Sequence, residues 1–358
     1  MMTRRVGKIA GDSLTAWAKA RRRFCPRGND DERAFAHPTI AATIVAVLLA
    51  ALCFTPASAE DYPVRPIRAI TATSAGGTSD IFMRLIGEGF LKHWGQPIIV
   101  ENRPGGNMMI GGHACAGAPN DGYTICILPI ETLSYAPFLY KNVPYDPTKD
   151  FVPITNPFFN TQVLVASTAL GVKNLDELAA LSKAKPRTLS YTVPSASLAL
   201  FMDKWKTATG ADLVRVPFRG GGEAVNGMLS GATPVAMFGL ANWIALLRGG
   251  QVRGLAIDSA ERSPLFPDIP TLTELGFGAN PTRIYFGIVA PAGTPAPIVH
   301  KLRDEIAAIG NDPEFRRKRL IEMGLDPVLN TPEEFADYLK QDRANAERVV
   351  KESGLQPQ

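Results

Sequence analysis

The stretch that decides the fold reads I-R-A-I-T-A-T-S-A-G-G-T-S-D-I-F-M-R-L-I, from Ile67 to Ile86. Its start, Ile67 to Thr71, is an apolar run typical of a buried strand. From Ile81 to Phe90 the apolar residues recur with the spacing of an amphipathic helix. A loop of small and polar residues, Thr73 to Asp80, joins the two. Strand, glycine-rich loop and helix in this order predict an α/β sheet with a functional loop at the carboxyl end of the strand.

This loop is suited to binding an anion. Gly76 and Gly77 let the backbone approach a ligand closely, and Thr78 or Ser79 is expected to cap the helix that begins near Asp80. The free N–H groups and partial positive charge at a helix N-terminus stabilise a carboxylate. The alternative is an ordinary capped turn without a ligand.

Outward from this stretch, strand-like and helical segments alternate, which is typical of a mostly parallel sheet covered by helices on both faces. One β-α-β-α-β unit spans residues 67–128 and a second unit spans residues 162–257. A further strand is expected at Tyr285–Ala290. Two similar units predict two lobes, with the chain crossing between them near residues 160 and 284 in a hinge.

Three helices are expected after this last strand. They begin at Thr294-Pro295, at Asp312-Pro313 and at Thr331-Pro332, each with an N-cap residue followed by Pro at the first helical position. The second of them is expected to run to Met323. Helices without partner strands need a surface to pack on, and the first lobe is expected to provide it.

A second small polar loop, Thr192-Val193-Pro194-Ser195-Ala196-Ser197, follows a predicted strand of the second unit. In open α/β sheets, ligands bind in crevices beyond the carboxyl ends of the strands. The two loops therefore are candidates for one shared binding site.

Residues 1–59 form the expected export segment. The run from Thr39 to Phe54 carries no charge, follows a basic region and leads to Ala57-Ser58-Ala59. This order predicts a secretory signal cleaved after Ala59, with an uncleaved membrane anchor as the alternative. The segment before the apolar run is unusually long for a signal. A start codon further downstream is therefore an open alternative.

The charge of the mature chain excludes a nucleic-acid surface. Of 38 Lys/Arg and 34 Asp/Glu, residues 1–59 hold nine and four, so 29 basic and 30 acidic residues remain from Glu60 onward. Binding to phosphate backbones needs a clustered basic face. The hydrophobic fraction of 46% is sufficient for two globular domains.

Two of the four cysteines, Cys25 and Cys53, lie in the export segment, so Cys115 and Cys126 remain. An oxidising compartment allows a disulfide between them. However, Cys115 falls in a predicted helix and Cys126 in the strand that follows, an arrangement that rarely meets the narrow Cβ distance of a disulfide. We therefore expect two buried, unpaired thiols.

The mature chain shows no constellation for catalysis or for a metal. Its three histidines, His93, His113 and His300, fall on predicted helices without the spacing of paired ligands. No G-x-S-x-G or Walker sequence is present, and the glycines from Gly105 to Gly112 miss the dinucleotide fingerprint. We expect a binding protein that is not an enzyme and uses no cofactor.

Longer motifs extend over residues 60–354. They are YPVRPI at 62–67, GGTSD at 76–80, GQPIIVENRPG at 95–105, DGYT at 121–124, PYDPTKDF at 144–151, VPFRG at 216–220, RSP and PDIPT within 262–271, and APAGTP at 290–295. Together they resemble the Bug-type periplasmic receptors of tripartite tricarboxylate transporters, also called the Bordetella uptake family.

The resemblance implies a two-lobed periplasmic-binding-protein fold, the Venus flytrap. Lobe 1 would be residues 60–160 with 284–358, and lobe 2 residues 161–283. The chain would be a monomer that closes on a small carboxylated solute and delivers it to membrane transporter subunits. Such receptors hold carboxylates largely through backbone N–H groups, hydroxyls and water.

Carried over position by position, the resemblance implies a ligand site drawn from both lobes. Its residues would be Thr73, Ser74, Ala75, Gly76, Gly77, Thr78, Ser79, Asp80, Glu131 and Thr132 from lobe 1, and Thr192, Pro194, Ser195, Ser197, Phe218, Arg219, Gly220 and Gly239 from lobe 2.

This sequence departs from the family at positions that bear on the ligand. Ala72 to Ala75 replaces the Pro-aromatic-Pro-Pro stretch of many members. Glu131 stands where a small residue is usual, and Gly239 where an acidic or amide residue is common, with Asn242 as a substitute amide. A glutamate facing a bound carboxylate is repulsive unless it is protonated or matched by a cation. We hypothesise that the ligand carries an amino group, a positive nitrogen or a neutral polar end. The alternative is that Glu131 caps the following helix and points away.

Three charged residues near the expected site have competing roles. Arg219 could pair with a carboxylate bidentately, although the resemblance gives its turn mostly backbone contacts. Arg283, at a crossing, is expected to be structural, and Asp80 to complement its helix dipole. Two rivals to a transport receptor remain: a receptor that docks on a signalling ectodomain, and a periplasmic enzyme acting on a small acid.

Overall fold

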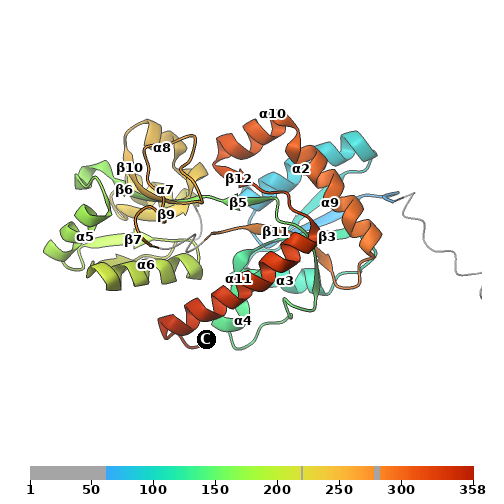
Figure 1. Cartoon of the computed structure of the whole chain (residues 1–358), viewed down its shortest axis with the longest axis horizontal. Helices are drawn as coiled ribbons and strands as arrows, with labels where there is room; N and C mark the ends of the chain where they lie inside the picture. Colours follow the sequence, from blue (N-terminus) through green and yellow to red (C-terminus); the bar gives the residue numbers. More distant parts are fainter. Residues whose placement is uncertain (1–61, 219–220, 278–282) are drawn as a thin grey trace, which may run out of the picture. The chain divides into compact units, whose positions relative to one another are not determined.

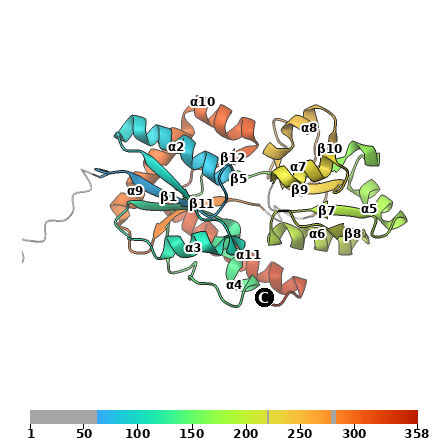
Figure 2. The ribbon, with the colours of Figure 1, turned by 180° about the vertical axis from the view of Figure 1, so that it is seen from behind.

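The computed structural model describes residues 62–218, 221–277 and 283–358. Strands in these ranges form two five-stranded sheets and one two-stranded ribbon, and helices cover the sheets (Figures 1 and 2). This arrangement confirms the predicted α/β class. The export segment with its cleavage site, and the candidate residues Arg219 and Gly220, lie outside the described residues.

The first sheet has the strand order β2-β1-β3-β11-β4. Its strands are β1 Ile67–Thr71, β2 Ile98–Asn102, β3 Thr124–Pro129, β4 Phe151–Thr155 and β11 Phe286–Pro291. Strand β1 pairs in parallel with β2 and β3, whereas β11 is antiparallel to β3 and β4. Two of the four strand pairs are thus parallel and two are antiparallel, so this sheet is less parallel than expected. The reason is that the chain enters β11 from the second sheet and not from a crossover helix.

Alternate residues of β1 pack on opposite faces of this sheet, as the two-residue period of a strand requires. Ile67 and Ala69 belong to one apolar cluster with α2 and α9, and Ile70 to another with α3 and α11. The helices and turns of this part are α2 Thr78–Trp94, η2 Gly106–Met108, α3 Met109–Ala116, η3 Glu131–Tyr135, α4 Ala136–Leu139, α9 Ala296–Asn311, α10 Pro313–Phe315, η6 Arg316–Leu320, η7 Ile321–Met323 and α11 Pro332–Ser353.

The second sheet has the strand order β10-β6-β9-β7-β8. Its strands are β6 Gln162–Ser167, β7 Leu189–Thr192, β8 Leu213–Arg215, β9 Val235–Gly239 and β10 Val252–Asp258. Strand β7 is parallel to β8 and β9, and β6 is antiparallel to β9 and β10. The second sheet therefore mixes strand directions as the first does.

Helices lie on both faces of the second sheet (Figures 1 and 2). They are η4 Thr168–Leu170, α5 Leu175–Ala184, α6 Ala196–Thr209, α7 Gly221–Leu229, η5 Leu240–Asn242 and α8 Ile244–Arg248. Leu164 and Ala166 of β6 share an apolar cluster with α5 and α6, while Val163 and Val165 share one with α7 and α8. Burial of both faces is the main favourable term for such a layered domain.

The chain passes from β4 to the second sheet through β5 Phe158–Asn160, which pairs with β12 Leu325–Pro327 in the ribbon. It returns to the first sheet between β10 and β11. The chain thus passes twice between the two sheets. The strands β4, β5 and β12 were not anticipated from the sequence pattern.

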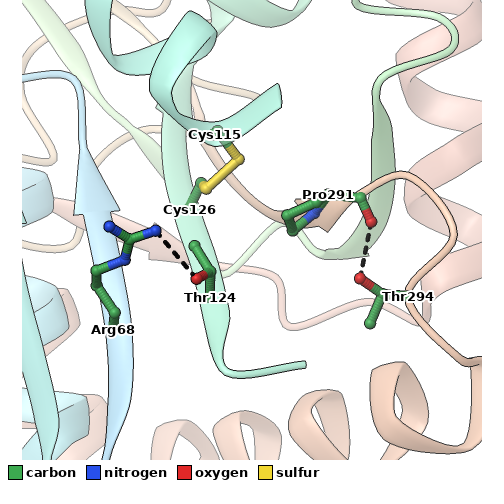
Figure 3. Close-up of a disulfide and its surroundings, with 6 residues drawn as sticks. All are labelled: Arg68, Cys115, Thr124, Cys126, Pro291 and Thr294. Atoms are coloured by element: carbon green, nitrogen blue, oxygen red, sulfur yellow. Dashed lines mark hydrogen bonds between the residues drawn. A yellow bond between two sulfur atoms is a disulfide. The ribbon is translucent and has the colours of Figure 1, made fainter. Parts of the chain in front are cut away.

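Cys115 of α3 and Cys126 of β3 form a disulfide, with Cα atoms 6.2 Å apart (Figure 3). The prediction of two unpaired thiols is therefore wrong. Cys126 lies on the face of β3 that α3 covers, in the same apolar cluster as Cys115, and this close packing brings the sulfur atoms together.

One of the expectations for the last three helices needs correction. Pro295 is the N-cap residue of α9, because the Thr294 hydroxyl donates to the Pro291 carbonyl instead (2.7 Å). The segment expected to be helical from Pro313 to Met323 is helical throughout, with the Asp312 side chain as its N-cap, and it passes from α-helix in α10 to π-helix in η6 and 3₁₀-helix in η7. The cap of α11 is confirmed, since Thr331 and Glu334 form a capping box.

Candidate functional site

The loop after β1 leads directly into α2, as predicted. Helix α2 begins at Thr78, with Gly77 as its N-cap residue and no side-chain cap. The expectation that Thr78 or Ser79 caps the helix is wrong. The Ser79 hydroxyl instead contacts the hydroxyls of Thr71 (2.7 Å) and Thr73 (2.5 Å).

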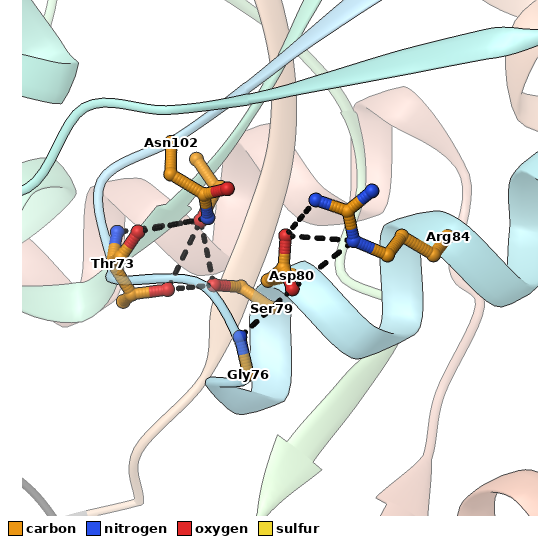
Figure 4. A network of polar contacts seen from close by, with 7 residues as sticks. Thr73, Gly76, Ser79, Asp80, Arg84 and Asn102 are labelled. Carbon is orange, nitrogen blue, oxygen red and sulfur yellow. Dashed lines mark hydrogen bonds and ion pairs between the residues drawn. The ribbon is translucent and has the colours of Figure 1, made fainter.

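These hydroxyls fix the loop to the end of β1 (Figure 4). The Thr71 and Thr73 hydroxyl oxygens lie 3.1 Å apart, and Asn102 at the end of β2 donates its amide to the Thr73 carbonyl (3.1 Å). Thr73 is partly buried and Ser79 is buried, whereas Ser74, Ala75 and Gly76 are exposed. The hydroxyl network therefore fixes Thr73 and Ser79, and the exposed turn from Ser74 to Gly76 lies between them in the chain.

Asp80 anchors the other end of the loop (Figure 4). Its carboxylate, with only 4% of the side chain exposed, accepts the Gly76 N–H (2.9 Å) and an Arg84 Nη2–H (2.9 Å). Burial by itself raises the pKa of Asp80, but the hydrogen bonds from Arg84, Gly76 and Asn102 outweigh it and bring the pKa below the ordinary value. Asp80 is thus an ionised residue that shapes the loop.

The N-terminus of α2 offers backbone donors at this loop. Gly77 donates its N–H to the Ser74 carbonyl (3.1 Å), and Ile81 donates to the Gly77 carbonyl (3.0 Å). The N–H groups of the residues between them, Thr78 to Asp80, lack intrahelical acceptors, and no other backbone acceptor in the described ranges takes them. Such donors, with the positive end of a helix dipole, can hold a carboxylate.

The loop after β7 starts the second candidate group. Ser195 is the N-cap residue of α6, and its hydroxyl accepts the Leu198 N–H (3.3 Å). The hydroxyls of Ser195 and Ser197 lie 3.0 Å apart. The Thr192 hydroxyl, at the end of β7, is fully buried and has no hydrogen-bond partner among the described residues.

Glu131, directly after β3 and Ile130, reaches this second loop. The Ser197 hydroxyl donates to Glu131 Oε1 over 3.1 Å. Ile130 is the N-cap residue of the turn that Glu131 begins, and it makes no side-chain cap. Burial raises the pKa of Glu131, and hydrogen bonds from its own backbone, Ser195 and Ser197 offset this only in part. The side chain therefore contacts the second-sheet loop and does not point away from it.

The remaining candidate residues have structural contacts of their own. Thr132 is buried and donates its hydroxyl to the Met108 carbonyl (3.3 Å). Phe218 packs on the cluster formed with α7. At Gly239 an added Cβ would lie 2.9 Å from Asn160 Oδ1, so a larger residue would require the Asn160 side chain to move. The Asn242 amide, the expected substitute, donates to the Gly239 carbonyl (3.0 Å).

A buried polar network near Glu131 was missed by sequence reasoning. The Tyr285 hydroxyl contacts the Ser134 hydroxyl (3.0 Å) and donates to an Asp342 oxygen (3.1 Å). Burial raises the pKa of Asp342 to about 6. No sequence signal marks Asp342, since it is one of several acidic residues on the polar-looking helix α11.

The described residues show no metal cluster and no helix fit for a membrane. No group of three His, Cys, Asp or Glu side chains in the described ranges could hold a metal ion. His93 pairs with Glu305 (2.7 Å), and His113 with the Pro144 carbonyl (2.9 Å). None of the helices in these ranges is both long and apolar enough to cross a membrane.

The sequence and the fold both match known proteins. A profile of the family described as "Tripartite tricarboxylate transporter family receptor" matches residues 82–355. Protein BugT of Bordetella pertussis is 30% identical to this chain, over 84% of the chain and 92% of BugT.

Two solved structures share the architecture. The periplasmic binding protein BugD superposes with a TM-score of 0.74 at 30% identity, over 83% of this chain and 100% of BugD. The R. palustris protein Rpa4515, solved with adipate, has a TM-score of 0.76 at 28% identity, over 83% of this chain and 100% of that protein. BugD belongs to the periplasmic binding proteins that the sequence motifs resemble.

Proposed function

The chain belongs to the tripartite tricarboxylate transporter receptor family, and from this premise we propose that it binds a small carboxylate at the N-terminus of α2 and delivers it to a membrane transporter. The proposal rests on the backbone N–H groups from Thr78 to Asp80, which follow the exposed turn Ser74 to Gly76. Hydrogen bonds among the hydroxyls of Thr71, Thr73 and Ser79 fix this loop. A relative solved with adipate supports a carboxylate as the ligand.

The proposed organisation has two lobes, residues 60–160 with 284–358 and residues 161–283. The two sheets and the two passages of the chain between them support this division. The site would take Thr73 to Asp80 from the first lobe and Thr192 to Ser197 from the second, with Arg219 and Gly220 as candidates outside the described residues. A ligand that contacts both lobes favours the closed state by its differential affinity.

The family and the structural neighbours are binding proteins. We extend this to the chain itself and propose that it turns over no substrate. We also propose that it acts as a monomer in the periplasm after cleavage behind Ala59. A receptor that signals through a membrane ectodomain would bind ligand in the same way, and a transport assay with the transporter genes separates the two roles.

A proline at Thr78 tests the site directly. Thr78 is the first residue of α2, where Pro fits the helix, and Gly77 before it has the extended ψ of 164° that a pre-proline residue needs. Thr78→Pro therefore removes one backbone donor without disturbing α2. We expect about tenfold weaker binding of the best carboxylate, as the loss of a hydrogen bond to a charged group predicts. Calorimetric titration gives the affinity.

Thr78→Ala is the matched control, because it removes the hydroxyl and keeps the N–H. Equal affinities of the Thr78→Pro and Thr78→Ala variants would place the carboxylate elsewhere. The ligand itself comes from a thermal-shift screen of mono-, di- and tricarboxylates, aromatic acids and amino acids. Ligand that is retained in stoichiometric amount without product supports a receptor, and accumulating product would support an enzyme.

A further inference from the structure

Glu131 links the two sheets through a single side chain. It follows β3 of the first sheet, and its carboxyl accepts from Ser197 at the first turn of α6, which covers the second sheet. Ser195, the N-cap residue of α6, lies beside Ser197 with 3.0 Å between the hydroxyls. Two hydroxyls and a helix N-terminus thus converge on one carboxyl of the protein.

This is a position that an anionic ligand group would otherwise favour. Helix α6 has 14 residues, and its N-terminus carries partial positive charge and unpaired N–H groups. Glu131 already supplies a carboxyl there. At α6, a carboxyl from the first-sheet side, Glu131, thus lies at the helix N-terminus. At α2, no carboxyl from the second-sheet side is in contact with the helix N-terminus among the described residues.

The surroundings of Glu131 make a second anion costly. Glu131 is partly buried, and Asp342 of α11 raises its pKa further through its negative charge. Tyr135 and Tyr140, which Glu131 influences, carry no positive charge, and the cations of this region in the described ranges, Arg348 and Arg343, act on Tyr135 and Asp342. A ligand carboxylate placed beside Glu131 would meet like charge at low local dielectric, whereas an ammonium or a neutral group would not.

We propose that Glu131 sets the ligand class: its carboxyl takes the place of a second ligand carboxylate at the N-terminus of α6, so the protein selects monocarboxylates whose far end is cationic or neutral. The inference rests on the proposed function, since it assigns the ligand's one carboxylate to α2. It agrees with the hypothesis of a ligand with an amino group or a neutral end. The contact from Ser197 to Glu131, on which the inference rests, is not evident from the sequence.

Matched ligand pairs test this selection. Each pair is a dicarboxylate and the ω-amino acid of similar length: succinate with 4-aminobutanoate, glutarate with 5-aminopentanoate, and adipate with 6-aminohexanoate. Calorimetric titration of the exported protein is expected to show at least tenfold tighter binding of the amino acid in the pair that fits. In Glu131→Gln this preference is expected to fall at least tenfold, because the amide can donate to a ligand carboxylate.

The control variant is Glu88→Gln, an exposed position of α2 where the same chemical change is expected to leave the preference intact. A wild-type preference for the dicarboxylate would overturn the inference without any variant, and so would an unchanged preference in a folded Glu131→Gln protein. In both cases carboxylate binding, and the proposed function, would stand. If the wild type binds no carboxylate of any class, the proposed function fails and the inference fails with it.

Discussion

At the scale of single residues, Asp342 predicts how stability depends on pH. Burial raises its pKa to about 6 from an ordinary 3.8. Between these values the folded protein keeps a proton that the unfolded chain has released. Asp342 therefore makes its full contribution to the free energy of unfolding below about pH 4. This contribution decreases as the pH rises towards 6. The expected loss is on the order of 1–3 kcal/mol.

Asp342→Asn should remove this contribution, because the amide keeps the shape and the acceptor oxygen for Tyr285. Urea unfolding between pH 4 and 7.5 is expected to show a shallower fall of stability with pH than in wild type. Some fall should remain, since the pKa of Glu131 is raised too. Asp337→Asn, on the exposed side of the same helix, is the control. Parallel curves for wild type and Asp342→Asn would contradict the prediction.

At the scale of elements, the contact of α3 with β1 positions the start of the ligand loop. Gly111 of α3 packs so closely on the residue after β1 that an added Cβ would lie 2.6 Å from the Cα of Ala72, which precedes Thr73. Helix propensity alone predicts that Gly111→Ala stabilises α3 by about 1 kcal/mol. We expect the reverse, a loss of about 1–3 kcal/mol from overpacking against backbone, together with weaker carboxylate binding.

Gly117→Ala is the control at the end of the same helix, where the added Cβ would have an ordinary contact of 3.6 Å with the His113 carbonyl. Denaturant unfolding measures both variants, and calorimetry measures their ligand affinity. Equal stability of the two variants would show that α3 can move away from β1 at little cost. The disulfide between Cys115 and Cys126 opposes that movement.

The elements also show where sequence reasoning ends. Helices α2 and α11 were predictable because apolar spacing and, for α11, a capping box mark them locally. Strand β4 was missed because Pro153 interrupts its pattern, and β5 and β12 because three residues carry no periodicity. The loops of the candidate site were predictable because each lies between a recognisable strand and a recognisable helix. The contact from Glu131 to Ser197 was not predictable, because it joins segments that belong to two different sheets.

At the scale of the whole molecule, Arg283 connects both passages of the chain between the sheets. Its guanidinium carbon lies 3.7 Å from the centroid of the Phe159 ring in β5, and it pairs with Asp326 of β12. The cation–π contact and the ion pair hold the return passage against the outgoing one. If the two lobes close on a ligand as proposed, bending occurs in these passages. Arg283 then limits how far they bend without ligand.

Arg283→Gln is therefore expected to widen the ligand-free ensemble. A smaller fraction of the ligand-free protein is then in the conformation that can bind. Because the apparent affinity is proportional to this fraction, binding should weaken several-fold. Small-angle scattering should show a larger decrease in radius of gyration on ligand addition than in wild type. Arg65→Gln, which breaks an exposed pair with Asp121 and a cation–π contact with Tyr123 outside both passages, is the control and should change neither quantity. Identical behaviour of the two variants would mean that Arg283 stabilises the ribbon alone and that closure bends elsewhere.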